Sequence, residues 1–94
     1  MGEAQVRGKS IAAIAKDVAE GYLFLNPLVL KKLEPSAYKR LHHELKKAQN
    51  EIRGENFPLH DTQAIRQRNM RLQRLHSALT ILEHTAKEKK IILV

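Results

Sequence analysis

The fold is decided by residues 35–53, whose sequence is PSAYKRLHHELKKAQNEIR. Apolar side chains recur in this stretch at alternating spacings of three and four, namely Tyr38, Leu41, Leu45, Ala48 and Ile52. That alternation is typical of a helix that packs one apolar seam against a neighbour. Pro35 suits the first turn of such a helix, so we predict a helix over residues 35–53.

A second seam of the same kind follows in the C-terminal half of the chain. Its members are Ile65, Arg68, Leu72, Leu75, Leu79, Leu82 and Ala86. They predict a helix over about residues 62–88, which Asp61 or Thr62 can cap. Glycine, asparagine and proline interrupt the pattern over residues 54–60, and a short loop of this kind makes its two helices antiparallel neighbours.

The two seams also predict how the two helices align. In an antiparallel pair the numbers of facing residues have a nearly constant sum, and one alignment matches apolar with apolar residues along both seams. The facing pairs in this alignment are Leu45 with Leu72, Glu44 with Arg71, and His42 with His76. The last turns of the second helix then project beyond the start of the first, so another element must cover Leu82 and Ala86.

The N-terminal third of the chain predicts two further helices. Apolar residues recur by threes and fours over about residues 10–25, and the Ser10 side chain can cap that helix. Asn26 must be extended because proline follows it, so Pro27 opens a new short helix that reaches Leu33.

These elements predict an all-α fold, a three- or four-helix bundle built on an antiparallel αα-hairpin with a long C-terminal helix. A chain of 94 residues suits one domain, residues 1–94. We expect residues 1–9 to be flexible and residues 91–94 to form an apolar tail.

The chain is strongly basic, with 17 Lys or Arg against 10 Asp or Glu and a formal net charge of +7. Cations gather on the outer face of the 35–53 helix, where Lys39, Lys46 and Arg53 form a row at intervals of seven. This face is either a solvated surface or a site for nucleic-acid phosphates. The candidate phosphate contacts on both long helices are Lys39, Arg40, Lys46, Lys47, Arg53, Arg66, Arg71 and Arg74.

Two segments carry more apolar residues than a small core can use, residues 23–33 and residues 91–94. They either cover the core within one molecule or form a contact with another protein or a second copy. The candidate contact residues are Phe24, Leu28, Leu30, Ile92 and Leu93.

Several kinds of function are disfavoured by the sequence. The chain contains no cysteine, which excludes disulfides and thiolate metal sites. No phosphate-binding glycine loop and no nucleophile beside a histidine is present, so we expect neither catalysis nor a cofactor. His42 and His76 are too small a ligand set to predict a metal. No stretch suits a membrane span or a signal peptide, which is compatible with a cytoplasmic protein.

The sequence therefore favours a small non-enzymatic helical interaction module, an adaptor or regulator that acts through protein contacts, with homodimerisation as one form of contact. The alternative is a nucleic-acid-binding accessory protein that uses the basic face of the 35–53 helix.

Overall fold

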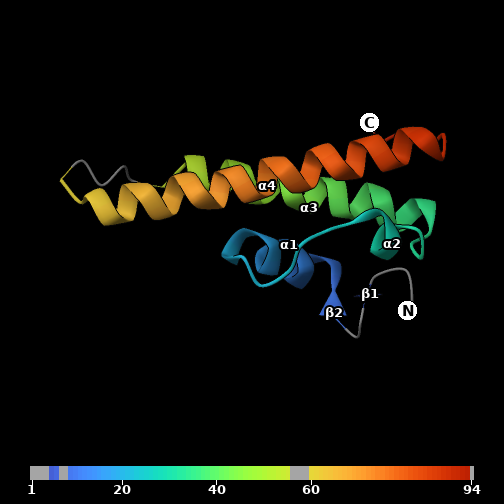
Figure 1. Ribbon diagram of the computed structural model, residues 1–94, viewed down its shortest axis with the longest axis horizontal. Coiled ribbons are helices and arrows are strands. Elements are labelled where there is room, and N and C mark those ends of the chain that lie inside the picture. Colours follow the sequence, from blue (N-terminus) through green and yellow to red (C-terminus); the bar gives the residue numbers. More distant parts are fainter. Residues whose placement is uncertain (1–4, 7–8, 56–59, 94) are drawn as a thin grey trace.

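A computed structural model of the protein describes residues 5–6, 9–55 and 60–93. Figure 1 shows the four helices of this part of the chain, of which the C-terminal one is the longest. The helices are α1 (Ile11–Glu20), α2 (Pro27–Leu30), α3 (Pro35–Arg53) and α4 (Thr62–Glu88). The predicted helical class and the long C-terminal helix are thus confirmed, and the bounds of α3 and α4 agree with the sequence pattern.

A very short antiparallel pairing precedes the helices, between β1 (Gln5–Val6) and β2 (Lys9–Ser10). The remainder of the segment expected to be flexible, residues 1–4 and 7–8, lies outside the described residues. Ser10 then caps α1 as predicted, because its side-chain oxygen accepts a 3.2 Å hydrogen bond from the amide of Ala13.

Helix α1 ends earlier than the sequence pattern predicts, at Glu20 rather than near residue 25. Gly21 is the cause, since its φ of 85° is left-handed and ends the helix. The amide of Gly21 donates to the carbonyl of Val18 at 3.1 Å, and the amide of Tyr22 donates to the backbone carbonyl of Asp17 at 2.9 Å. Residues 21–26 therefore form a linker without regular structure between α1 and α2.

Helix α2 begins where the Asn-Pro pair predicts, but it ends at Leu30 rather than Leu33. The Asn26 side chain accepts a 2.9 Å hydrogen bond from the amide of Val29. Leu30 is completely buried, and its carbonyl accepts a 2.7 Å hydrogen bond from the hydroxyl of Tyr38 on α3. This single turn thus anchors the linker to the core.

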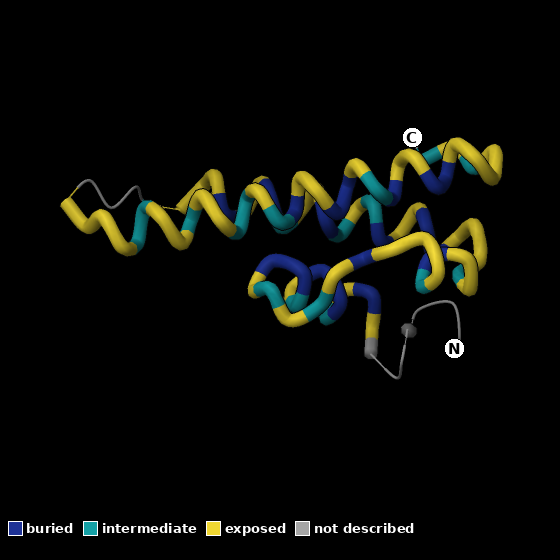
Figure 2. Tube along the Cα trace, in the orientation of Figure 1, coloured by how far each residue is buried: buried dark blue, intermediate teal, exposed yellow. Residues whose placement is uncertain are grey.

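The core lies where α1, α3 and α4 face one another, with α2 packed against α4 (Figure 2). Its largest fully buried side chains include Ile14 from α1, Leu41 and Leu45 from α3, and Leu75 and Leu82 from α4. The molecule is elongated, with principal extents of 44 × 25 × 20 Å.

The alignment of α3 with α4 differs from the predicted one by about two helical turns. His42 lies 3.1 Å from Glu83 instead of beside His76, and Arg71 donates to Glu55 at 3.2 Å instead of facing Glu44. The start of α4 consequently projects beyond the end of α3 (Figure 1), which reverses the predicted overhang.

Burial explains why this alignment holds. Leu82 and Ala86, which the predicted alignment left beyond α3, are 0% and 1% exposed in the core. In this alignment the N-terminal part of α4 stays exposed to solvent, since no residue of α4 before Leu75 is buried. Burying the leucine-rich end removes more apolar surface from water than burying the arginine-rich start would.

Candidate functional site

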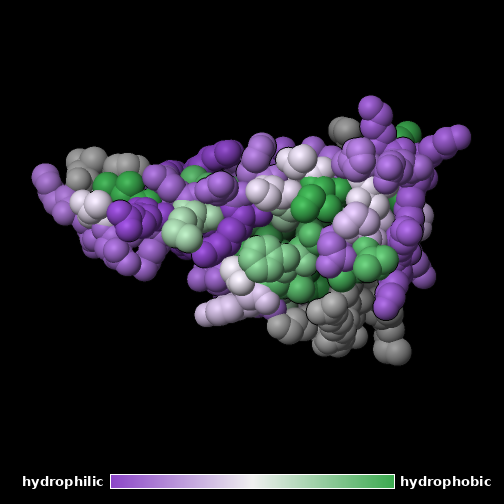
Figure 3. All heavy atoms as spheres, in the orientation of Figure 1, coloured by the Kyte–Doolittle hydropathy of each residue, from purple (hydrophilic) through white to green (hydrophobic). Residues whose placement is uncertain are grey.

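Large exposed apolar side chains lie on the linker, on α2 and on the first half of α4. Phe24 (75% exposed) and Met70 (44% exposed) line one groove, and Tyr22 (80%) and Leu28 (73%) are exposed apolar side chains close to Phe24 in the sequence. We call these four residues the apolar patch. Figure 3 shows hydrophobic surface gathered on this side of the molecule, with hydrophilic residues around it. Clustered large apolar side chains are typical of contact surfaces, whereas single ones are common on any protein.

A groove of about 210 Å³ runs beside Phe24, and we call it the Phe24 groove. Its apolar lining comes from Val18 of α1, Leu23 and Leu25 of the linker, and Ala78 and Ile81 of α4. The residues that line it thus belong to three segments that are distant in sequence.

Arg74 of α4 lines this groove and binds the end of α1, just before the linker begins. Its guanidinium donates a 3.1 Å hydrogen bond to the carbonyl of Ala19, one of the last carbonyls of α1. A side chain at Gly21 would bring its Cβ within 3.0 Å of the same guanidinium. A cation at the C-terminal end of a helix is also favoured by the helix dipole. The sequence pattern assigned Arg74 to phosphate binding and missed this bridge, because nothing in the sequence places α4 against the end of α1.

The residues predicted for a partner contact separate into three environments. Phe24 and Leu28 belong to the apolar patch, as described above. Leu30 is a core residue with no exposed surface, so its assignment to a contact surface is wrong. Ile92 is 72% exposed and Leu93 is half-buried, and both line a second groove that shares no residue with the Phe24 groove.

This second groove, the tail groove, has a volume of about 640 Å³ and lies between α3 and the C-terminal tail. Its lining combines apolar tail residues with polar or charged side chains from three segments, namely His42, Lys46, Glu83, Lys87 and Lys90. The sequence analysis did not connect Lys87 and Lys90 with α3, because the predicted alignment placed the end of α4 beyond the start of α3.

The predicted phosphate contacts also fall into two groups. Six are exposed, and they are Lys39, Arg40, Lys46, Lys47, Arg53 and Arg66. Arg71 and Arg74 are half-buried and hydrogen-bonded to protein oxygens, Arg71 to the Glu55 carboxylate and Arg74 to the Ala19 carbonyl. Of the exposed α3 cations, Lys47 also lines a hollow beside α1, whereas Lys39, Lys46 and Arg53 do not. Arg66 lies apart from them near the projecting start of α4.

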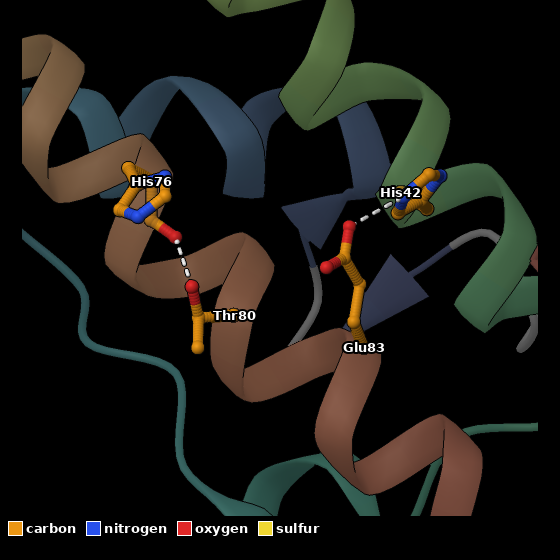
Figure 4. Close-up of polar contacts among 4 residues, drawn as sticks. All are labelled: His42, His76, Thr80 and Glu83. Carbon is orange, nitrogen blue, oxygen red and sulfur yellow. Dashed lines mark hydrogen bonds and ion pairs between the residues drawn. The ribbon is translucent and has the colours of Figure 1, made fainter.

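The histidines do not form the pair that the predicted alignment implied. Figure 4 shows His42 directed toward Glu83, while His76 lies apart and its carbonyl accepts a 3.0 Å hydrogen bond from the hydroxyl of Thr80. Over residues 5–6, 9–55 and 60–93, no three side chains of His, Asp or Glu are grouped closely enough to hold a metal ion.

Within the described ranges, no helix is both long enough and apolar enough to cross a membrane. Comparison of the chain with protein-family models, with curated proteins and with solved structures gives no match. The functional argument therefore rests on the surfaces described above.

Proposed function

We propose that the protein is a small non-catalytic helical interaction module, an adaptor or regulator that binds another protein through the apolar patch and the Phe24 groove. The observation that carries the proposal is the position of Phe24, which is 75% exposed beside a groove with apolar walls. A partner that covers the Phe24 ring and fills the groove removes apolar surface from water. The removal of apolar surface from water is the main driving force of protein association.

The linker that presents Phe24 is held at both of its ends. At one end the Gly21 cap and the Arg74 bridge fix it to α1, and at the other the buried Leu30 fixes it to α3. A surface that is already ordered loses less conformational entropy when it binds. The proposal treats α3 and α4 as the antiparallel hairpin of a four-helix bundle in one domain, and this hairpin supports the linker. It includes a cytoplasmic location, which cell fractionation would test.

A second copy of the chain is the simplest partner. One self-complementary patch repeated across a two-fold axis makes a closed dimer, which is the commonest form of self-association. The patch consists of uncharged side chains, so no cations meet within it. The net charge of +7 on each copy opposes association over a longer range, and salt that screens this repulsion should favour the dimer.

Light scattering over a range of protein concentrations, with the variant Phe24→Ser, tests the proposal. Ile92→Ser is the matched control, because Ile92 is 72% exposed but lines the other groove. We expect the wild type and the control to dimerise and Phe24→Ser to remain monomeric, with unchanged circular dichroism. A photo-reactive residue at position 24 should cross-link to the same position of a second chain. A monomeric wild type that gives the same cross-linked products from positions 24 and 92 would overturn the proposal.

A further inference from the structure

The outer face of α3 is a continuous basic surface, which we call the basic face. Lys39, Lys46 and Arg53 are all exposed, and each lies seven positions from the next along the helix. At 1.5 Å per residue this spacing is about 10 Å, so the row extends over roughly 21 Å. Two other exposed polar side chains, His43 and Asn50, lie between these cations, and neither is acidic.

The alignment of α3 with α4 extends this surface beyond one helix. Lys87 at the end of α4 and Lys90 after it line the tail groove together with Lys46 of the basic face. Glu83 is the acidic residue of that groove, and it lies 3.1 Å from His42. In the described part of the chain, no ion pair involves Lys46, Lys87 or Lys90.

Acidic residues of α3 are concentrated on the side toward α1. Glu44 and Glu51 line a hollow with α1 residues, and Glu55 lies in the same hollow and accepts from Arg71. Glu51 also borders His43 and Lys46, where it marks the edge of the basic face. Lys47 also lines the hollow beside α1, but Lys39, Lys46 and Arg53 do not. The electrostatic field of these three cations is therefore not cancelled by a facing row of carboxylates.

We propose that the basic face, with Lys87 and Lys90, binds the sugar-phosphate backbone of double-stranded nucleic acid without reading its sequence. A row of about 21 Å covers about six base pairs at 3.4 Å per pair, so successive cations can meet phosphates along a groove edge. This site is separate from the apolar patch, and it does not depend on the proposed protein contact.

A duplex fits the surface better than a single strand does. Proteins that hold single strands stack bases on aromatic side chains. Among the described residues, the exposed Tyr and Phe side chains are Tyr22 and Phe24, and both belong to the apolar patch. The basic face consists mainly of cations, and its other polar side chains are Asn50 and His43. One imidazole ring gives much less stacking surface than the rows of aromatic side chains that hold single strands, whereas the cations suit phosphates.

Fluorescence anisotropy with a short DNA duplex, an RNA duplex of the same sequence and the single DNA strand tests the proposal at several salt concentrations. Five phosphate contacts predict a slope of about −4.5 for the logarithm of affinity against the logarithm of salt concentration. The triple variant Lys39→Gln, Lys46→Gln and Arg53→Gln should lose about three units of that slope. The duplexes should bind more tightly than the single strand.

The matched control is the triple variant Lys16→Gln, Lys31→Gln and Lys32→Gln. It removes the same charge from exposed side chains that belong neither to α3 nor to the tail groove, so it should keep the wild-type slope. A double variant, Lys87→Gln and Lys90→Gln, should lose about two units, because both lysines extend the surface. Circular dichroism of every variant should match the wild type, since all these side chains are exposed.

Three results would overturn the proposal. The first is equal weakening by the two triple variants, which would show a general charge effect. The second is an absence of duplex binding by the wild type at the lowest salt concentration. The third is equally tight binding to vesicles of anionic phospholipid with the same dependence on Lys39, Lys46 and Arg53, which would assign the face to membranes. None of these results bears on Phe24, so this site and the proposed function can fail separately.

Discussion

The Tyr38 hydroxyl donates a 2.7 Å hydrogen bond to the carbonyl of Leu30, and both residues are completely buried. The contact joins the first turns of α3 to the single turn of α2. Lys89 adds to the junction, because its ammonium lies 5.6 Å from the centre of the Tyr38 ring and donates to the carbonyl of Lys31 at 3.0 Å. This end of the core is therefore held by polar contacts within an apolar environment.

Replacing Tyr38 by Phe should lower the free energy of unfolding by about 1 kcal/mol, the usual net contribution of one such hydrogen bond. The loss stays modest because the carbonyl of Leu30 also accepts from the amide of Leu33 at 3.0 Å. Urea denaturation measures it. Tyr22→Phe is the control, since Tyr22 is 80% exposed, and it should change stability by less than about 0.5 kcal/mol. Equal losses in the two variants would contradict the role given to Tyr38.

Alkaline pH should destabilise the protein through the same hydroxyl. Burial raises the pKa of Tyr38 above its ordinary value of 10.0. The unfolded chain therefore releases this proton at a lower pH than the folded chain does, and stability present below pH 10 is lost as the pH rises above it. Unfolding free energies measured at about pH 9 and about pH 11 should differ more for the wild type than for Tyr38→Phe, which lacks the proton. The same difference in both proteins would show that other groups, such as lysines, cause the loss.

Gly21→Ala should cost about 1–2 kcal/mol, because an L side chain is strained at the φ of 85° that ends α1. The new Cβ would also lie 3.0 Å from the Arg74 guanidinium. Gly54→Ala is the matched control, since Gly54 ends α3 at a φ of −82°, which any residue adopts. Thermal and urea unfolding should show a larger loss of stability for Gly21→Ala than for Gly54→Ala. A larger loss for Gly54→Ala would contradict the left-handed cap.

The bounds of α3 and α4 could be read from the sequence because local signals set them. Pro35 occupies the first turn of α3, and the Asp61 side chain accepts a 3.0 Å hydrogen bond from the amide of Ala64 at the start of α4. Their alignment could not be read in the same way. A shift of seven residues brings a heptad seam back onto itself. The predicted alignment, with His42 beside His76, and the observed one, with His42 beside Glu83, therefore match apolar with apolar residues almost equally well.

The contact residues show a second limit of the same kind. Leu28 and Leu30 are close in sequence and equally apolar, but two residues apart on a helical turn they point to nearly opposite sides. One is 73% exposed and the other is fully buried. The buried residue is Leu30, whose carbonyl accepts from the Tyr38 hydroxyl of α3. Apolar periodicity does not report which side of so short a helix packs against another element.

The alignment itself can be tested by comparing Leu82→Ala with Leu72→Ala. Leu82 is 0% exposed and Leu72 is half-buried, so the first variant should lose about 2–5 kcal/mol of unfolding free energy and the second distinctly less. The alternative alignment pairs Leu72 with Leu45 and leaves Leu82 beyond the start of α3, which predicts the opposite order for the two variants. Urea denaturation of both variants decides between the two alignments, because the same side-chain atoms are removed at each site. A greater loss for Leu72→Ala would mean that α4 is shifted back by two turns, and that Lys87 and Lys90 no longer adjoin the basic face.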